Sequence, residues 1–283
     1  MSNNFRLIDI KTFKKVSSLF AGNYKTNFLG AGMEFDELRQ YSFGDDVKNI
    51  DWLASAKNSK VFVKKYIEER EIELLFIIDT GTSMYFGFEN KTKLEIAKEI
   101  FEILALSGIK NQNKIGVIFY NNKEIIDLKS KKTLQNFFLI KRKFDEIISK
   151  DSLATSNINK VLENLFKKQK RNSIIFIMSD YLDEINEIYF KALSNKNDLI
   201  FINTFDDFEN NLDGKGFYNL VGNQKNIEIN IENKDKKEKY INLRNEKISK
   251  FKKKIFSLGG SYLKTSNIDD IFSVLYKFFK LRK

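Results

Sequence analysis

Three amino acids, cysteine, histidine and proline, are absent from the 283 residues of this chain. Without cysteine there are no disulfides, thiolate nucleophiles or cysteine zinc sites. Without histidine there is no Ser-His-Asp triad, imidazole base or histidine metal site. Without proline the turns depend on glycine, asparagine, aspartate and serine. The pattern G-x-x-x-x-G-K-[ST] is missing as well, so a P-loop nucleotide site is not expected.

Long hydrophobic runs are also missing. No apolar run reaches the roughly 18–20 residues that span a bilayer, and the start, MSNNFRLIDIKTFKK, lacks the apolar core of a signal peptide. With 42% hydrophobic and 14% aromatic residues, the chain can fill a sizeable core. We therefore expect a soluble, cytoplasmic protein without a membrane span.

The formal charge is +11, but arginine supplies only seven of the 49 basic residues. Lysine is spread along the chain, and its densest run, residues 234–254, is interleaved with acidic residues. Charge of this kind is usually a solvated face. Nucleic acid is therefore not expected as the partner.

The stretch 74–84, LLFIIDTGTSM, joins an unbroken apolar run to Asp79 and small hydroxyl residues. A continuous apolar strand is typical of a parallel sheet covered on both faces. Ligands of such sheets bind beyond the carboxyl ends of the strands, where Asp79 is expected. The carboxylate oxygens of Asp79 and the hydroxyl oxygen of Ser83 suit a hard cation such as Mg2+. The alternative is that Asp79 only caps the following turn.

The rest of the chain alternates between predicted strands and helices. Strands are expected at 114–120, 124–128, 172–178, 198–204 and 261–264, and helices at 93–106, 133–148, 157–167, 184–194, 236–258 and 268–280. This alternation predicts an α/β fold with a doubly wound, mainly parallel sheet flanked by helices. Residues 217–231 break the alternation and predict a hairpin at the periphery of the sheet.

The N-terminal quarter follows no such pattern. An amphipathic helix is expected at 8–20, and a long loop that ends in a strand at 60–66 is expected within 30–70. Long loops are usually functional or pinned by side chains. Pinning is favoured, with Arg39 bridging an aspartate bidentately and Trp52 anchoring the loop on the sheet domain. Paired carboxylates acting as acid and base are the weaker alternative.

Residues 30–71 also carry a long motif, G-x-G-x-E-F-D-E-L-R-x-Y-x-x-G-D-D-x-[RK]-x-I-D-W followed by V-x-x-x-x-E-E-R-E. It resembles the signature of the family called domain of unknown function 58, with Lys48 where arginine is common. The signature positions are Arg39, Tyr41, Gly44, Asp45, Asp46, Asp51 and Trp52. The resemblance, over nearly the whole chain, implies a signature segment at 1–70 and a von Willebrand factor A-like, Rossmann-type domain at 71–283. It also implies a MoxR-type AAA+ ATPase as the associated protein.

The resemblance further implies a metal-ion-dependent adhesion site. Asp79, Gly81 and Ser83 fall on its first loop, Thr155 on its second and Asp180 on its third. The ion would be Mg2+, with Mn2+ as a substitute. Gly81 stands where the motif has a serine, so water would replace one ligand and the affinity would fall. A weakened metal site, a decayed site kept for its loop shape, and a chance similarity of the later loops all stay open.

Two functions follow from these observations. The favoured one is a non-enzymatic protein-interaction module, a partner or adaptor of the MoxR-type ATPase. The alternative is a Mg2+-dependent hydrolase that uses Asp79 and Asp180. Against it, no lysine or arginine is recognisable in the predicted loops to clamp a phosphate.

Overall fold

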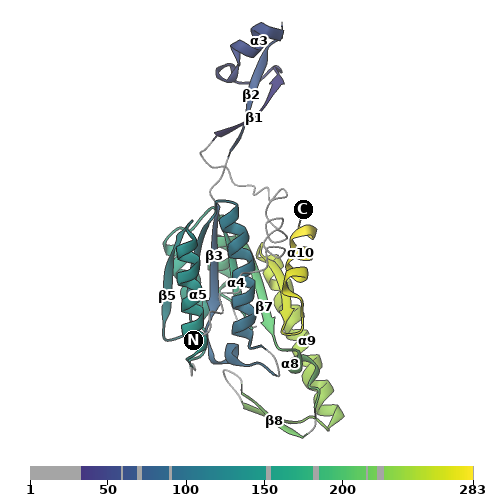
Figure 1. Ribbon diagram of the computed structural model, residues 1–283. Helices are drawn as coiled ribbons and strands as arrows, with labels where there is room; N and C mark the ends of the chain where they lie inside the picture. Colours follow the sequence, from purple (N-terminus) through teal and green to yellow (C-terminus); the bar gives the residue numbers. More distant parts are fainter. Residues whose placement is uncertain are drawn as a thin grey trace. The chain divides into compact units, whose positions relative to one another are not determined.

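The computed structural model describes residues 33–58, 60–68, 72–88, 91–150, 154–180, 185–214, 216–221 and 226–282 (Figure 1). They belong to two compact units, one within residues 25–71 and one that comprises residues 72–283. Each unit is described by itself. The helix predicted at 8–20 lies outside the described residues.

The smaller unit is a β-hairpin with a helical insertion. Strand β1 (Met33–Gln40) pairs antiparallel with β2 (Phe62–Glu68). The short 3-10 helix η1 (Val47–Asn49) and the helix α3 (Trp52–Asn58) lie between them. The predicted long loop is therefore wrong for this part of the chain. The strand β1 is formed by pairing with residues more than twenty positions away, which local periodicity does not reveal.

Side chains of the predicted signature hold the turns of this unit. Arg39 Nη2 lies 2.5 Å from Asp45 Oδ1, while Asp45 Oδ2 accepts the Ser42 N–H at 2.8 Å. The predicted bridge from Arg39 to an aspartate is therefore confirmed, but its predicted bidentate geometry is wrong, because Arg39 contacts only one Asp45 oxygen and donates its Nη1 to the Gln40 carbonyl. The hydrogen bond from Arg39 holds the pKa of the Asp45 carboxyl below its usual value. Gly44 takes a left-handed φ of +105°, which glycine adopts without strain.

The other signature residues act locally. Asp46 caps η1 through the Lys48 N–H at 3.0 Å, and Asp51 Oδ1 accepts the Ala54 N–H at 3.0 Å. Tyr41 donates its backbone N–H to the Val61 carbonyl. Trp52 begins α3 with its side chain 67% exposed, and its anchoring role stays a prediction.

The larger unit is built on a six-stranded sheet with the order β10-β7-β6-β3-β4-β5. The strands are β3 (Glu73–Asp79), β4 (Lys114–Tyr120), β5 (Ile125–Lys131), β6 (Ser173–Ser179), β7 (Asp198–Phe205) and β10 (Ser261–Ser266). All neighbours are parallel except β4 and β5. The predicted doubly wound, mainly parallel sheet flanked by helices is therefore confirmed, and its order is the 3-2-1-4-5-6 arrangement.

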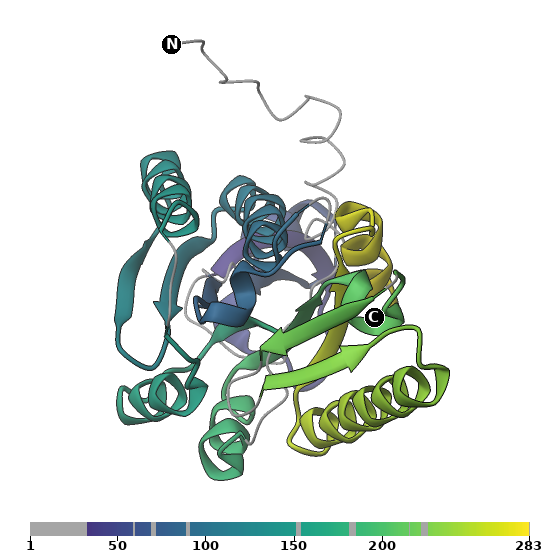
Figure 2. The ribbon, with the colours of Figure 1, turned by 90° about the horizontal axis from the view of Figure 1, so that it is seen from below.

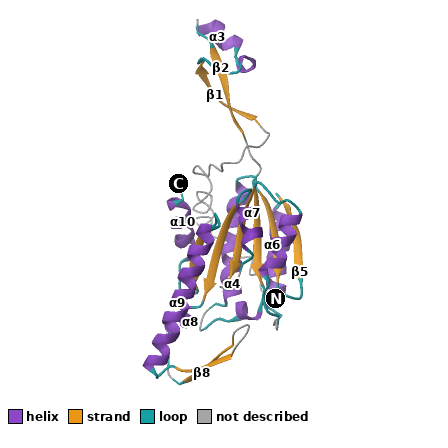
Figure 3. Ribbon diagram, turned by 180° about the vertical axis from the view of Figure 1, so that it is seen from behind, coloured by secondary structure: helices purple, strands orange, loops and turns teal. Residues whose placement is uncertain are grey.

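Among the described residues, three helices pack on each face of this sheet, and Figure 2 shows both helical layers. One face packs against α4 (Lys93–Lys110), α5 (Leu134–Ile148) and α10 (Ile271–Leu281). The other packs against α6 (Ile158–Lys167), α7 (Glu187–Ser194) and α9 (Lys234–Ser257), which Figure 3 shows from behind. Because both faces are covered, the middle strands are apolar on both sides, as their continuous hydrophobic runs predicted.

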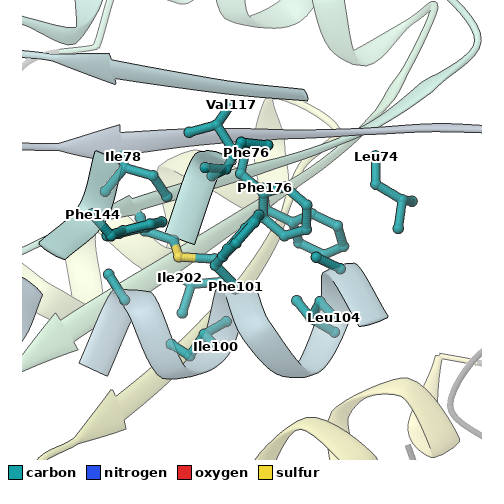
Figure 4. Packing of buried hydrophobic residues seen from close by; sticks show 14 of the residues in the cluster. Leu74, Phe76, Ile78, Ile100, Phe101, Leu104, Val117, Phe144, Phe176 and Ile202 are labelled. Carbon is teal, nitrogen blue, oxygen red and sulfur yellow. The ribbon is translucent and has the colours of Figure 1, made fainter. Parts of the chain in front are cut away.

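Aromatic rings fill the centre of the first face (Figure 4). Phe76 of β3 lies edge-on to Phe101 of α4, with ring centroids 5.1 Å apart, and stacks on Phe176 of β6 at 5.0 Å. All three side chains are fully buried. This packing holds the middle of α4 against the middle of β3, next to β6.

The hairpin predicted at 217–231 is confirmed. Its strands β8 (Phe217–Val221) and β9 (Asn226–Asn230) pair antiparallel and form a separate two-stranded sheet. The short helix α8 (Asp207–Asn211) was not predicted. Its Phe208 and the following Leu212 pack with Ile231 in a small separate cluster, which provides the hairpin with a core of its own. None of the helices in the described residues combines the length and hydrophobicity needed to cross a bilayer.

Candidate functional site

The candidate site lies where the strand order of the main sheet reverses. From β3 the chain proceeds to β4 and β5 on one side, and β6 then starts the other half on the opposite side of β3. Asp79 ends β3, and Asp180 directly follows β6, the strand paired with β3. The short 3-10 helix η2 (Thr82–Tyr85) follows Asp79, near the middle of this end of the sheet (Figure 2). Ligands of doubly wound sheets bind at such a switch point.

Asp79 is fully buried, and three neighbours donate hydrogen bonds to its carboxylate. Oδ1 accepts the Gly81 N–H at 2.8 Å and the Ser156 hydroxyl, and Oδ2 accepts the Ser179 hydroxyl at 2.6 Å. Burial, and then the nearby charge of Asp180, raise the pKa of Asp79 to about 6, although these hydrogen bonds act in the opposite direction. The carboxylate therefore ties the loops after β3 and β6 to the loop before α6.

Asp180 is held by a second set of contacts. Its Oδ1 accepts the Ser83 hydroxyl at 2.8 Å, and its Oδ2 lies 2.7 Å from Lys93 Nζ. The Lys93 ammonium also lies 2.5 Å from Glu209 Oε1 of α8, and Arg244 Nη2 of α9 lies 2.8 Å from Glu209 Oε2. We call these four residues, Asp180, Lys93, Glu209 and Arg244, the Lys93 ion-pair chain. It joins the ends of β6 and β7 to α4 and α9.

The structure thus brings three of the predicted metal ligands together. Asp79 and Asp180 are close enough to shift the pKa of Asp79, and Ser83 bonds directly to Asp180. Thr155 lies half-buried on the second loop, where its carbonyl accepts the Asn122 N–H. Its neighbour Ser156 is the residue of that loop that bonds to Asp79. The assignment of Thr155 as a ligand stays a prediction.

Gly81, which replaces the serine of the resembled motif, lies against Ser156. A Cβ atom at residue 81 would come within 2.1 Å of Ser156 Oγ and 3.1 Å of Asp79 Oδ1. The space that a side chain at residue 81 needs is therefore filled by the Ser156 hydroxyl. Since φ at Gly81 is −70°, the backbone itself does not require glycine there.

The side chains present do not fit a divalent metal in this arrangement. Both oxygens of Asp79 already accept hydrogen bonds, and both oxygens of Asp180 are engaged by Ser83 and Lys93. An ion at Asp180 would lie beside the Lys93 ammonium, which repels it. Among the described residues, no group of three or more acidic side chains converges as metal ligands do. The predicted Mg2+ site stays a prediction, with these contacts against it.

The sequence did not identify Lys93, Glu209, Ser156 and Ser179 as residues of the site. Cations were expected only in the predicted loops, whereas Lys93 lies in the first turn of α4. One signal was available, because Lys93 shares the apolar face of that helix with Ala97 and Ile100. A lysine at the N-terminal end is also unfavourable with respect to the helix dipole, which points to another role.

The chain matches the family described as "Protein of unknown function DUF58" over residues 37–248, and it therefore belongs to that family. It is 21% identical over 202 residues to the uncharacterized protein Rv1480 of Mycobacterium tuberculosis and, to the same extent, to the uncharacterized protein Mb1516 of Mycobacterium bovis. The match covers 71% of this chain and 64% of each relative, so the chain spans less than two thirds of their length.

Two solved structures are similar to the larger part of the chain. The conserved hypothetical protein BatB from Bacteroides thetaiotaomicron has a TM-score of 0.47 and 13% identity, and covers 74% of this chain and 98% of its own. The VWA domain of SpRpn10 has a TM-score of 0.41 and 10% identity, and covers 73% and 94%. At such TM-scores these likenesses add nothing to the topology described above.

Proposed function

We propose that this protein is a non-enzymatic protein-interaction module that binds a protein partner with the carboxyl end of its main sheet. The first candidate is a MoxR-type AAA+ ATPase, which the family resemblance implies. On this proposal the switch point is a degenerate adhesion site, in which Asp79, Ser83 and Asp180 hold the loops in shape. Gly81 stands where such a site has a serine ligand.

A cleft beside the switch point is the observation that carries the proposal. It has a volume of about 300 Å3, and Thr80 and Ala154 of the switch-point loops form part of its lining. Tyr85 and Ile126 add apolar surface, and the charged lining residues are two lysines and one glutamate, Lys123, Lys150 and Glu124. Interfaces gain most of their binding energy where a few anchor side chains fill such hollows. A cleft that combines apolar side chains with an excess of positive over negative charge favours a partner segment with both apolar and acidic side chains.

The hydrolase alternative has less support. The carboxylates of Asp79 and Asp180 already accept hydrogen bonds from serines, a backbone N–H and Lys93. Lys93 is the cation that the predicted loops lacked, but both of its carboxylate partners lie within the protein. Metal-dependent turnover that is lost in Asp79→Ala would support the hydrolase and contradict the interaction module.

A matched pair of lysines tests the proposed surface. Lys150 lines the cleft and lies 2.9 Å from Glu146, whereas Lys167 ends α6 on the opposite face of the sheet and lies 2.6 Å from Glu163. Both pairs are four residues apart in sequence, and the two lysine side chains are 70% and 68% exposed. Each charge reversal therefore removes an exposed ion pair near the end of a helix, α5 or α6, and the position of the new charge is the main difference.

The affinity of the purified chain for a MoxR-type ATPase is to be measured with the ATPase in its ATP and ADP states. We expect Lys150→Glu to weaken binding by roughly tenfold, about 1.4 kcal/mol, and Lys167→Glu to leave it unchanged. An absence of binding in both nucleotide states would contradict this ATPase as the partner. Equal losses in the two variants would contradict the cleft as the binding surface.

A further inference from the structure

Lys93 is an unusual residue for the first turn of a helix. Its side chain is only 1% exposed, although an ammonium is costly to bury and a helix N-terminus already carries partial positive charge. Neighbouring residues of the turn form an ordinary cap, because the Thr92 hydroxyl accepts the Glu95 N–H and Glu95 bonds back to the Thr92 N–H. The helix therefore needs no cation at residue 93. The contacts of the Lys93 side chain explain why it is buried.

Those contacts are with carboxylates from two different strand ends. Asp180 follows β6, and Glu209 lies on α8, which follows β7. The remaining oxygen of Asp180 accepts the Ser83 hydroxyl, and that of Glu209 accepts from Arg244. The Phe86 ring, with its centroid 5.5 Å from Nζ, covers another side of the ammonium. Burial lowers the pKa of Lys93, but Asp180 and Glu209 outweigh it and raise that pKa above its usual value.

We propose that the Lys93 ammonium is the resident cation of the switch-point site. The ammonium contacts Asp180 after β6 and Glu209 after β7, and Asp180 in turn accepts the hydroxyl of Ser83 after β3. A bound divalent ion would join these loops in the same way. The loops are consequently held in place without a metal. This inference concerns how the site is held together and does not depend on which partner the site binds.

Removal of the ammonium is expected to create a metal site. Lys93→Ala leaves the Asp180 and Glu209 carboxylates facing one emptied space beside Ser83, a set of hard oxygens suited to Mg2+ or Mn2+. Wild-type protein offers no such space. A metal response should therefore appear in the variant and be absent from the wild type, the reverse of what loss of an ordinary metal ligand would do.

The test is thermal unfolding of the full chain in EDTA, Mg2+ and Mn2+. We expect no metal-dependent shift for the wild type. In EDTA, Lys93→Ala should lower the midpoint by roughly 10 °C, because two buried carboxylates lose their cation. Saturating metal should raise it again by roughly 5 °C. Adding Asp180→Asn should abolish that recovery. Lys91→Ala is the matched control, since Lys91 lies two residues earlier in an exposed pair with Glu99.

Two results would overturn the proposal. The first is a wild-type midpoint that rises with Mg2+ and no longer does so in Asp79→Ala. The second is a Lys93→Ala variant as stable as Lys91→Ala and without a metal response. Should Lys93→Ala fail to fold, Glu209→Gln removes one carboxylate and leaves the Lys93–Asp180 pair. A midpoint reduced by roughly 5 °C would then support the bridge, and an unchanged midpoint would contradict it.

Discussion

A methyl group added at residue 81 tests whether Ser156 fills the space of the missing serine. A Cβ there meets Ser156 Oγ at 2.1 Å, so Gly81→Ala requires the hydroxyl to rotate away from Asp79. The buried carboxylate then loses a charge-assisted hydrogen bond, which costs about 1.5–3 kcal/mol. At a φ of −70°, alanine also restricts the unfolded chain, which stabilises by about 0.4–1 kcal/mol. The net expectation is a loss of about 1–2 kcal/mol.

The assay is urea unfolding of single and double variants. Ser156→Ala removes the same hydrogen bond and opens the space, so in that background Gly81→Ala should no longer cost stability and should instead stabilise by about 0.4–1 kcal/mol. We expect a coupling free energy of about 1.5–3 kcal/mol between the two substitutions, the cost of the lost hydrogen bond. Ser179→Ala is the matched control, because it removes a hydroxyl from the other oxygen of Asp79 and opens no space at Gly81. Its coupling with Gly81→Ala should be smaller.

Two outcomes would refute this reasoning. A stabilising Gly81→Ala would mean that the close approach of Ser156 is relieved without loss of its bond to Asp79. Strictly additive costs of Gly81→Ala and Ser156→Ala would mean that the two residues do not compete for one space. Either result would leave the glycine without a steric explanation.

Three further predictions concern the rest of the larger unit. Burial raises the pKa of Glu73, but hydrogen bonds led by that from Lys170 outweigh it and hold this pKa below its usual value. The stability advantage of wild type over Glu73→Gln should therefore be complete above the unfolded pKa of about 4.3 and disappear as the pH falls below it in urea titrations. Thr92→Ala should cost about 1 kcal/mol in the same assay, because the capping box with Glu95 is lost. Phe76→Ala should cost about 3–5 kcal/mol, since a fully buried ring is removed, and a cost below 1 kcal/mol would contradict its central place in the core.

Much of the main sheet was predictable because its strands are marked locally. Residues 114–120 form β4 as predicted, and the predicted helix at 157–167 differs from α6 by one residue. Continuous apolar runs identify strands covered on both faces, and helical periodicity identifies the helices between them. In the hairpin β1–β2, the predicted strand at 60–66 corresponds to β2, whereas β1 escaped prediction. Apolar and polar residues alternate only over 33–36, and the register shift between Phe35 and Glu37 breaks the alternation before Leu38.

The sequence by itself determined the class of fold, the family and the position of Asp79 and Asp180 directly at the ends of two strands. It did so because strand and helix patterns, turn residues and a long motif are properties of neighbouring residues. Only the tertiary structure decided what surrounds those carboxylates. Lys93 meets Asp180 and Glu209 across 87 and 116 residues of chain, and Ser156 meets Asp79 across 77. Such contacts follow from how helices pack on the sheet, and packing of distant segments leaves no local periodicity to detect.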